Sequence, residues 1–180
     1  MDEVARSIRV GSTPYTEPFA DWRRLGFALG GFVAGEGCFS SRTIDRRRPG
    51  TPPRMRFTFT VTVAARDRVL VTALHELLGR VGGVYEGASR RSGWQSTISL
   101  QVTALADHLV ATIPFAEQFL NPAGHKFRQY RSWHGRLQEY RQGEAERMAA
   151  RPTMCTTDGC DRPIRAGGLC RGCYWRATGN

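Results

Sequence analysis

The sequence lacks a hydrophobic run long enough to cross a membrane. Its longest strongly apolar stretch, residues 25–35, falls short of the roughly 20 residues that a spanning helix needs. The N-terminus carries no apolar segment followed by a small-residue cleavage site, so we expect no secretory signal. These two absences argue against a membrane or secreted protein and make the cytoplasm the expected compartment.

Cysteine is scarce over most of the chain. Cys38 stands alone, and the other four cysteines follow the spacing Cys-x4-Cys-x9-Cys-x2-Cys near the C-terminus. In a reducing compartment such a cluster favours a metal site over disulfides. Four thiolates with no competing histidine favour structural Zn²⁺ in tetrahedral geometry. The predicted zinc ligands are Cys155, Cys160, Cys170 and Cys173.

The segment that carries these cysteines, residues 153–180, is too short to build a hydrophobic core. Bound zinc would therefore have to supply its folding free energy. Arginines surround the cluster, which predicts a second DNA contact; a protein–protein module or a purely stabilising one is the alternative. The arginines that we assign to this contact are Arg162, Arg165, Arg171 and Arg176.

Acidic residues are in the minority, 16 against 26 basic ones, which gives a net charge of +10. This balance favours a polyanionic partner, with an acidic protein surface or an anionic membrane as second choices. The chain also lacks internal repeats, and its 180 residues suit one compact domain with a small appendage. We expect a flexible N-terminal arm over 1–17, a main domain over 18–142, a linker or helix end over 143–152, and the zinc module over 153–180.

Hydrophobic periodicity predicts an α+β main domain. Helical spacing covers residues 22–35 and 69–78, strands are expected at 38–44, 54–63, 84–85 and 94–103, and two more helices at 104–119 and 126–150. Strand 54–63 alternates apolar and polar residues strictly, which is typical of a half-exposed strand. The order α-β-β-α-β-β-α-α predicts a four-stranded antiparallel sheet with helices on one face.

Polar residues of these strands fall on the side away from the predicted core. Arginine, glutamine and hydroxyl side chains are those that contact base edges and phosphates. Solvent-facing strands can be rich in Thr and Arg without binding anything, but the net charge favours DNA binding. The predicted DNA-binding residues of the sheet are Ser40, Arg42, Arg54, Arg56, Thr58, Thr60, Thr62, Gln95, Thr97, Ser99 and Gln101.

Small residues line one flank of the first predicted helix. Gly26, Gly30 and Ala34 recur every four residues and Gly31 lies on the neighbouring row, a pattern that serves close helix–helix packing. We predict that two copies of the helix pack through these four residues; packing against the chain's own sheet is the alternative.

Glu36 comes at the end of the same helix. A carboxylate there faces the negative end of the helix dipole and gains nothing unless a cation is supplied. Two packed helices would bring two Glu36 side chains together, forming an acidic pair that could hold Mg²⁺ through oxygen ligands. We assign Glu36 and the adjacent Gly35 to this metal site; a solvated glutamate in a glycine-rich turn is the alternative.

The run Leu-Gly-Gly-Phe-Val-Ala-Gly-Glu-Gly-Cys-Phe over residues 29–39 resembles the signature of the LAGLIDADG homing endonucleases, in their variant ending Gly-Glu-Gly-Cys-Phe. The similarity extends, with gaps, over residues 21–133. It implies a mixed αββαββα domain with an antiparallel DNA-binding sheet. By the resemblance Lys126, the only lysine in the chain, matches the family's active-site lysine and is catalytic together with Glu36. Where the family commonly has Gln-Lys, this chain has Ala65-Arg66.

The resemblance implies a site-specific endonuclease of the single-motif type. We expect a homodimer that hydrolyses both strands of double-stranded DNA with Mg²⁺, leaves short 3′ overhangs, and recognises a pseudo-palindrome of roughly 20 base pairs. Such a protein would be encoded by a prokaryotic or phage mobile element and would lie on the nucleoid when bound. The alternatives are a catalytically inactive DNA-binding regulator or splicing maturase with the same fold, and a zinc-stabilised interaction protein.

Overall fold

The computed structural model describes residues 9–10, 13–14, 21–44, 54–88, 95–165 and 167–178. The chain forms two compact units, residues 1–137 and 138–180, which are described separately. Most of the predicted arm, 1–17, lies outside the described residues. Within it, β1 (Arg9–Val10) pairs antiparallel with β2 (Thr13–Pro14). No helix of the described part is long and apolar enough to cross a membrane.

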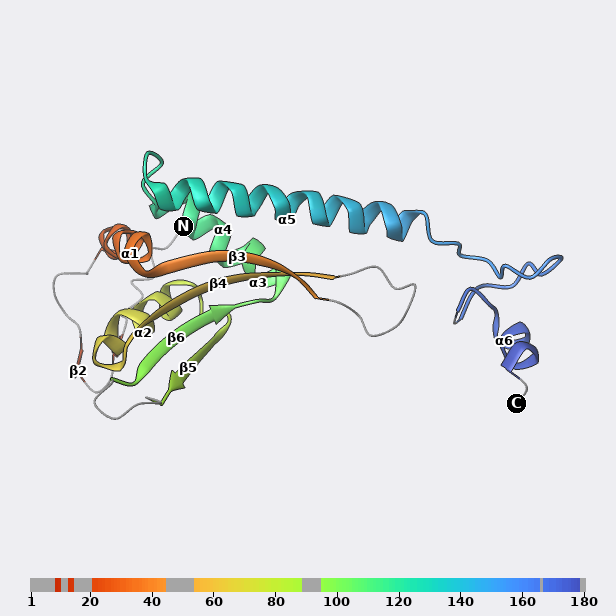
Figure 1. The fold of residues 1–180 in the computed structure, drawn as a ribbon, viewed down its shortest axis with the longest axis horizontal. Helices are drawn as coiled ribbons and strands as arrows, with labels where there is room; N and C mark the ends of the chain where they lie inside the picture. The colour runs from red at the N-terminus through yellow and green to blue at the C-terminus, as the bar shows by residue number, and fades with distance from the viewer. Residues whose placement is uncertain are drawn as a thin grey trace. The chain divides into compact units, whose positions relative to one another are not determined.

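The first unit follows the predicted order of helices and strands (Figure 1). Its elements are α1 (Trp22–Glu36), β3 (Gly37–Ile44), β4 (Arg54–Ala64), η1 (Ala65–Asp67), α2 (Arg68–Leu77), β5 (Gly83–Gly87), β6 (Thr97–Val102), α3 (Leu105–Asp107), η2 (His108–Thr112), α4 (Ile113–Phe119) and α5 (His125–Ala149). The predicted α+β, αββαββα architecture is therefore confirmed.

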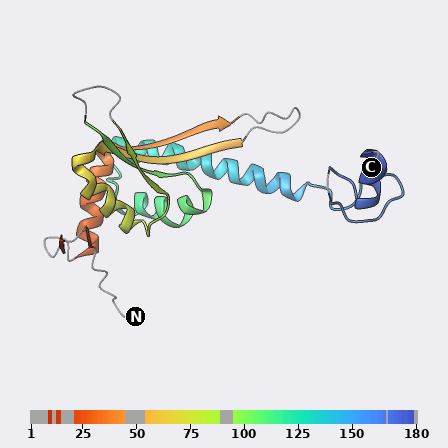
Figure 2. The same ribbon diagram turned by 90° about the horizontal axis from the view of Figure 1, so that it is seen from below.

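The four longer strands form one antiparallel sheet in the order β3-β4-β6-β5. Its apolar face carries fully buried residues from the central strands, among them Phe59, Val61 and Leu100. The helices α2 and α3 to α4 lie on this face (Figure 2), and the first half of α5 adds Tyr130 and Trp133 to the same core. Within the described residues of the first unit, no helix lies on the opposite face of the sheet, where Thr62, Thr97 and Gln101 are exposed.

The helix expected over 104–119 is divided into three pieces. Pro114 has no N–H to donate at the start of α4, and the turn before it, η2, is a π-helix. His108 in η2 is buried, with Nδ1 3.2 Å from Thr112 Oγ1 and Nε2 3.2 Å from the Phe57 carbonyl oxygen. Burial lowers the pKa of His108, so this histidine is a satisfied neutral core residue.

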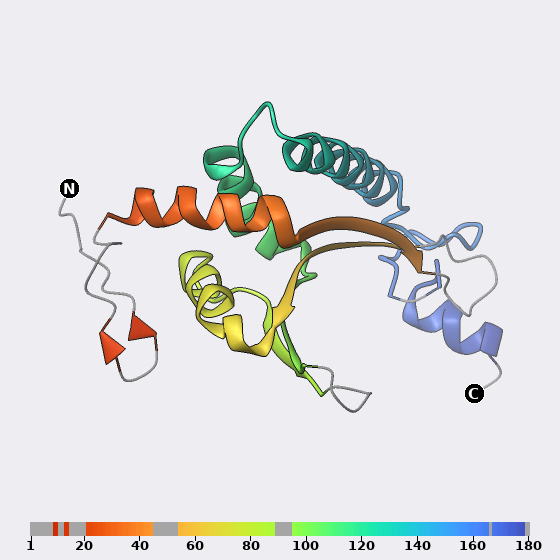
Figure 3. The ribbon, with the colours of Figure 1, turned by 60° about the vertical axis from the view of Figure 1, so that its left-hand side comes forward.

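The first half of α5, up to Leu137, lies beside the edge strand β3 (Figure 3). Gln129 Nε2 donates to the Phe39 carbonyl at 3.5 Å, and Trp133 Nε1 donates to the Ser40 carbonyl at 3.0 Å. An uncovered strand edge offers its free backbone groups to other chains. The side chains of α5 therefore close this edge and fix the helix along β3.

The second unit contains the end of α5, a backbone bridge between Met154 and Pro163, and α6 (Arg171–Thr178). The boundary between the units falls inside α5, just after Leu137, the last buried residue of that helix. Residues 143–149 of the predicted linker are helical.

Candidate active site, DNA-binding face and zinc centre

Glu36 is the last residue of α1, and its side chain is exposed. Gly37 caps the helix in an extended conformation and leads directly into β3. A Cβ at Gly37 would lie 2.7 Å from both the carbonyl oxygen and Cγ1 of Val33, so only glycine fits this close approach. The last turn of α1 holds no basic residue. The Glu36 carboxylate therefore stands at the negative end of the helix without a compensating charge from its own helix.

Lys126 reaches the same junction from α5. Its Nζ donates a hydrogen bond to the Gly37 carbonyl oxygen at 2.5 Å, and its side chain is half-buried. The two predicted catalytic residues are 90 positions apart in the sequence, and the structure brings the Lys126 ammonium group to the residue that follows Glu36. The packing of α5 on β3 achieves this, since the contacts of Gln129 and Trp133 continue the row that Lys126 begins.

The donor atoms at this junction fit a hard cation such as Mg²⁺. Glu36 offers carboxylate oxygens, and nothing lies within 4 Å of the Cβ position of Gly35, so the end of the helix is open. Apart from the four C-terminal cysteines, the described residues bring no three His, Cys, Asp or Glu side chains together. One chain thus supplies a single carboxylate here, which is half of the expected acidic pair.

The polar face of the sheet is assembled by cross-strand pairing. Thr60 pairs with both Cys38 and Gln101, and Ser99 pairs with both Thr62 and Tyr85. Residues directly opposite each other in antiparallel strands share a face, so the register places most of the predicted DNA-binding residues on one surface. The members within the strands are Ser40, Arg42, Arg54, Arg56, Thr58, Thr60, Thr62, Thr97, Ser99 and Gln101, while Gln95 precedes β6 and is exposed.

Tyr85 on this face was missed from the sequence. Its side chain is 56% exposed and stands beside Ser99 in the edge strand β5. The parity of the short strand, in which Tyr85 follows Val84 and precedes Glu86, carries the signal. An exposed aromatic ring among hydroxyl and guanidinium groups extends the apolar contact that this face can offer to a sugar or a thymine methyl group.

The prediction that α1 packs on a second copy through Gly26 and Gly30 is corrected by the structure. A Cβ at Gly26 would lie 2.3 Å from the Phe119 ring, and one at Gly30 would lie 2.2 Å from the Phe119 carbonyl oxygen, so both positions are occupied from within the chain. Gly31 and Ala34 face away from this contact: both are exposed, and nothing lies within 4 Å of the Gly31 Cβ position.

The Ala65-Arg66 pair lies in η1, directly after β4. Arg66 is exposed and forms an ion pair with Asp67, with Nε 3.8 Å from Oδ2. No glutamine or lysine takes the place of these residues at the end of the strand, so the side chain that the resemblance would place there is absent.

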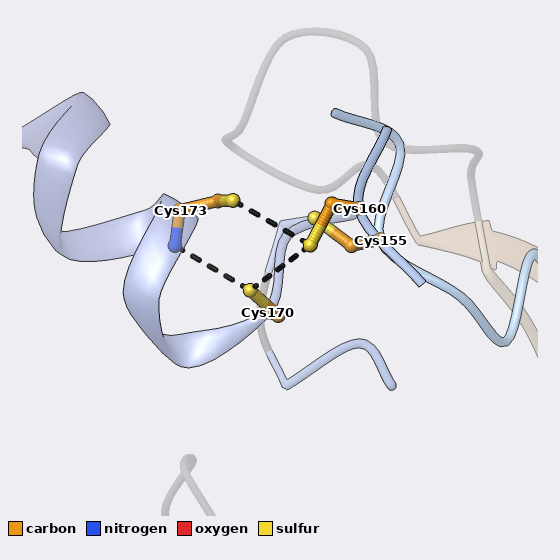
Figure 4. Close-up of side chains that lie close together, drawn as sticks. All are labelled: Cys155, Cys160, Cys170 and Cys173. Atoms are coloured by element: carbon orange, nitrogen blue, oxygen red, sulfur yellow. Dashed lines mark hydrogen bonds between the residues drawn. The ribbon is translucent and has the colours of Figure 1, made fainter. Parts of the chain in front are cut away.

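The four C-terminal cysteines converge (Figure 4). Their sulfur atoms lie within 4.8 Å of one another, with Cys160 Sγ 3.7 Å from Cys170 Sγ and 3.8 Å from Cys173 Sγ. Tetrahedral Zn²⁺ with bonds of about 2.3 Å places its sulfur ligands about 3.8 Å apart. All four thiols are free of disulfides. The cluster therefore has the donor set and the spacing of a tetrahedral zinc site.

Hydrogen bonds and burial shift the pKa values of two of the thiols in opposite directions. The hydrogen bond with the Thr157 hydroxyl, helped by backbone contacts, lowers the pKa of Cys155 to about 6 and so favours the thiolate that binds metal. Although the Arg162 backbone acts in the opposite direction, burial and the three neighbouring thiols raise the pKa of Cys160 to about 11. Arg176 Nη2 donates a hydrogen bond to Cys173 Sγ at 3.2 Å. This contact with a sulfur atom distinguishes Arg176 from Arg162, Arg165 and Arg171.

The sequence profile of a family described as LAGLIDADG endonuclease matches residues 29–135, more than half of the chain. The chain belongs to this family. Among solved structures, meganuclease I-SmaMI bound to uncleavable DNA is 27% identical with a TM-score of 0.56, over 66% of this chain and 38% of that one. I-CeuI, a group I intron-encoded homing endonuclease complexed with DNA, is 17% identical with a TM-score of 0.58, over 70% of this chain and 59% of that one. A search of curated proteins found no match.

This LAGLIDADG chain spans well under half the length of the I-SmaMI structure. The family match ends at residue 135, ahead of the cysteine cluster. The polar sheet face, Glu36 and Lys126 all fall within the matched region, whereas the four-cysteine cluster lies outside it.

Proposed function

We propose that the protein is a site-specific DNA endonuclease that hydrolyses both strands of its target as a homodimer with Mg²⁺. The observation that carries the proposal is the α1–β3 junction. There Glu36, whose carboxylate is exposed, is followed by Gly37, whose carbonyl oxygen accepts a hydrogen bond from Lys126. This junction opens at the start of β3, one of the strands that form the polar face. Family membership and the DNA-bound relatives support the same function.

Glu36, Lys126 and the polar face of the sheet would each have a separate role in this reaction. Glu36 would hold Mg²⁺, which when bound supplies Lewis acidity and a nucleophilic water for phosphodiester hydrolysis. Lys126, fixed on the Gly37 carbonyl, adds a positive charge that stabilises charge developing on phosphate oxygens. Arginine and hydroxyl groups of the sheet hold the duplex in register, and base contacts by the same face select the site.

A digestion experiment tests this proposal. A DNA library with randomised sites is incubated with the protein, with and without Mg²⁺, and the ends are sequenced. We expect Mg²⁺-dependent double-strand breaks with short 3′ overhangs at one inverted-repeat sequence. Tight, salt-dependent binding with no cleavage would instead identify an inactive regulator or maturase, a role for which the Ala65-Arg66 departure provides a reason. DNA binding without salt dependence would reject both functions.

We infer a homodimer because one chain supplies only half of the expected pair of carboxylates. Each chain contributes one Glu36 carboxylate, and the exposed part of α1 that includes Ala28, Gly31 and Ala34 has almost no side-chain volume. Phe27, 61% exposed, borders it. A twofold contact through this surface would bring two Glu36 residues together and form the acidic pair.

Substitutions at two glycines of α1 distinguish an effect on the folding of one chain from an effect on dimer formation. Gly30→Ala should destabilise the isolated fold, because its Cβ would lie 2.2 Å from the Phe119 carbonyl oxygen; overpacking of this kind costs about 1–3 kcal/mol. Gly31→Leu should leave the fold intact but reduce dimer mass in sedimentation, because its Cβ meets nothing within the chain. An unchanged dimer in the Gly31→Leu variant would show that α1 does not form the interface.

Footprint length follows from strand length. β4 has 11 residues, which at about 3.4 Å each cover roughly 37 Å, or about 11 base pairs of B-DNA per chain at 3.4 Å per base pair. We expect a dimer to protect a pseudo-palindrome of roughly 20 base pairs, extended symmetrically if the zinc modules touch DNA. Deleting residues 150–180 should shorten the footprint on both flanks without moving the cut; a one-sided footprint would contradict the dimer.

Zinc, location and origin complete the proposal. Residues 153–180 would fold around structural Zn²⁺ held by the four cysteines. In chain order they would follow a main domain over 18–142 and a linker or helix end over 143–152. A nuclease of this kind would be encoded by a mobile element in a prokaryotic or phage genome and would act in the cytoplasm, on the nucleoid.

A further inference from the structure

The second unit, residues 138–180, carries the four cysteines and is called the zinc unit below. It has a surface pocket of about 380 Å³ lined by arginines. Its lining consists of three arginines and the residues next to them in the chain: Arg162, Pro163, Ile164, Arg165, Cys170, Arg171 and Gly172. All of these residues belong to the unit 138–180, so the pocket does not depend on how the two units are placed. Neither the predicted nuclease site nor the zinc ligation explains why three arginines gather there.

Backbone hydrogen bonds around the zinc cluster hold the pocket in shape. Cys155 N donates to the Arg162 carbonyl at 2.8 Å, Ile164 N donates to the Thr153 carbonyl at 3.0 Å, and Arg165 N donates to the Leu169 carbonyl at 2.9 Å. The Cβ position of Gly172 lies 3.5 Å from Arg162 Nη1, which puts this guanidinium over the first turn of α6. The two chain segments that carry the arginines are thus fixed by the same fold that holds the cysteines.

The three arginines carry uncompensated charge. None of them forms an ion pair within the part of the chain that the structure describes. The first turn of α6 contains no acidic residue, so the positive end of that helix adds to the guanidinium groups. Asp158 and Asp161 are the acidic residues of 153–180, and neither lines the pocket. The concentration of positive charge in a concave site points to an anion.

We propose that this pocket binds a phosphodiester group of the DNA backbone, an inference that rests on the proposed function. Guanidinium groups and helix N-termini are the usual protein partners of phosphate oxygens. Base edges lie recessed in the grooves and are read by protruding side chains, whereas a phosphate protrudes and enters a concave site. The zinc unit therefore adds affinity that is independent of base sequence, and selection of the site is left to the sheet.

The salt dependence of binding tests this assignment on the full-length protein. Binding to a random-sequence duplex is measured over a range of salt concentrations without added Mg²⁺, so that cleavage does not contribute, and the zinc content of each variant is verified. Replacing Arg162, Arg165 and Arg171 by Gln should reduce the slope of log K against log salt by about 0.9 for each phosphate that a chain no longer neutralises. Affinities for random and selected DNA should fall by the same factor.

Matched variants separate this role from a structural one. Arg176→Gln removes the same charge from the same unit, but its guanidinium lies on Cys173 Sγ, so we expect a nearly unchanged slope. Replacing the three pocket arginines by Lys keeps the charge and should restore most of the slope. If the triple Gln variant loses zinc, Arg165→Gln and Arg171→Gln are measured singly, each with an expected decrease of up to about 0.9.

Two results would overturn the assignment. A wild-type slope in zinc-loaded Gln variants would show that the pocket binds no phosphate. Altered base preference on the flanks of sites selected by these variants would show that the arginines read bases. Neither result affects the proposed nuclease, whose own failure appears separately, as a wild-type protein with no salt-dependent DNA binding or no Mg²⁺-dependent cleavage.

Discussion

Glu36→Gln is expected to abolish DNA cleavage and leave DNA binding nearly unchanged. The substitution keeps the size of the side chain and removes the charge that would hold Mg²⁺ at the end of α1. Metal catalysis contributes several kcal/mol of transition-state stabilisation, and about 1.4 kcal/mol is a factor of ten in rate. The cleavage rate should therefore fall by about a thousandfold or more, while the arginines and hydroxyls of the sheet still hold the duplex.

The matched control is Glu86→Gln. Glu86 lies in β5 and forms a surface ion pair with Arg68 at 2.7 Å, a type of pair that contributes about 0–1 kcal/mol. We expect this variant to cut at the wild-type rate. Cleavage is followed on a supercoiled plasmid carrying the selected site, and binding is measured on the same site without added Mg²⁺. Mg²⁺-dependent cutting retained by Glu36→Gln would reject the metal assignment.

The fold could be predicted from local pattern because its strands are half-buried. β4 alternates buried Phe57, Phe59 and Val61 with polar residues, and this period of two sets which residues share a face before any partner strand is known. The left-handed conformation of Gly79, with φ of +75°, ends the α2 segment where the sequence placed the helix end. Elements whose burial follows their own periodicity were therefore recovered.

Features that depend on a distant partner could not be predicted in this way. Glycine spacing on α1 indicates that something approaches the helix closely, but it cannot tell Phe119 of the same chain from a second copy. The contact of Lys126 with Gly37 requires α5 to lie along β3, which no local pattern encodes. The resemblance pointed to Lys126 and Glu36 separately, and only the fold shows that Lys126 contacts the residue that follows Glu36.

The zinc unit shows a third situation, in which spacing predicts the site but not the surroundings. The cysteine spacing alone gave the ligand set that the sulfur distances fit. Among the surrounding arginines, however, the sequence could not separate Arg176, which contacts a sulfur atom, from those that line the pocket. Charge was visible in the sequence, whereas the direction of each side chain depends on backbone turns at Gly159, Gly167 and Gly168, all with positive φ.

Removal of Zn²⁺ is expected to unfold the C-terminal unit beyond α5 and leave the main domain folded. The buried residues of that segment are Cys155, Cys170 and Cys173, with Cys160 and Leu169 packed against them. Structural zinc contributes about 10–16 kcal/mol of binding free energy in small zinc domains, far more than this cluster can supply by burial. Without the ion, nothing would hold the four cysteines together, and the segment would lose its only core within the described residues.

Cys170→Ser should reproduce the effect of a strong chelator, and Cys38→Ser is its matched control. Cys170 is a buried member of the cluster, whereas Cys38 is exposed on the sheet. Limited proteolysis with mass spectrometry should show new cleavages after about residue 153 in the chelated protein and in Cys170→Ser, but not in Cys38→Ser. The denaturant midpoint of the main domain should stay the same in all three, because its core contains no cysteine from the cluster. A C-terminal segment that resists protease after verified zinc loss would mean that the cysteines do not fold around a metal.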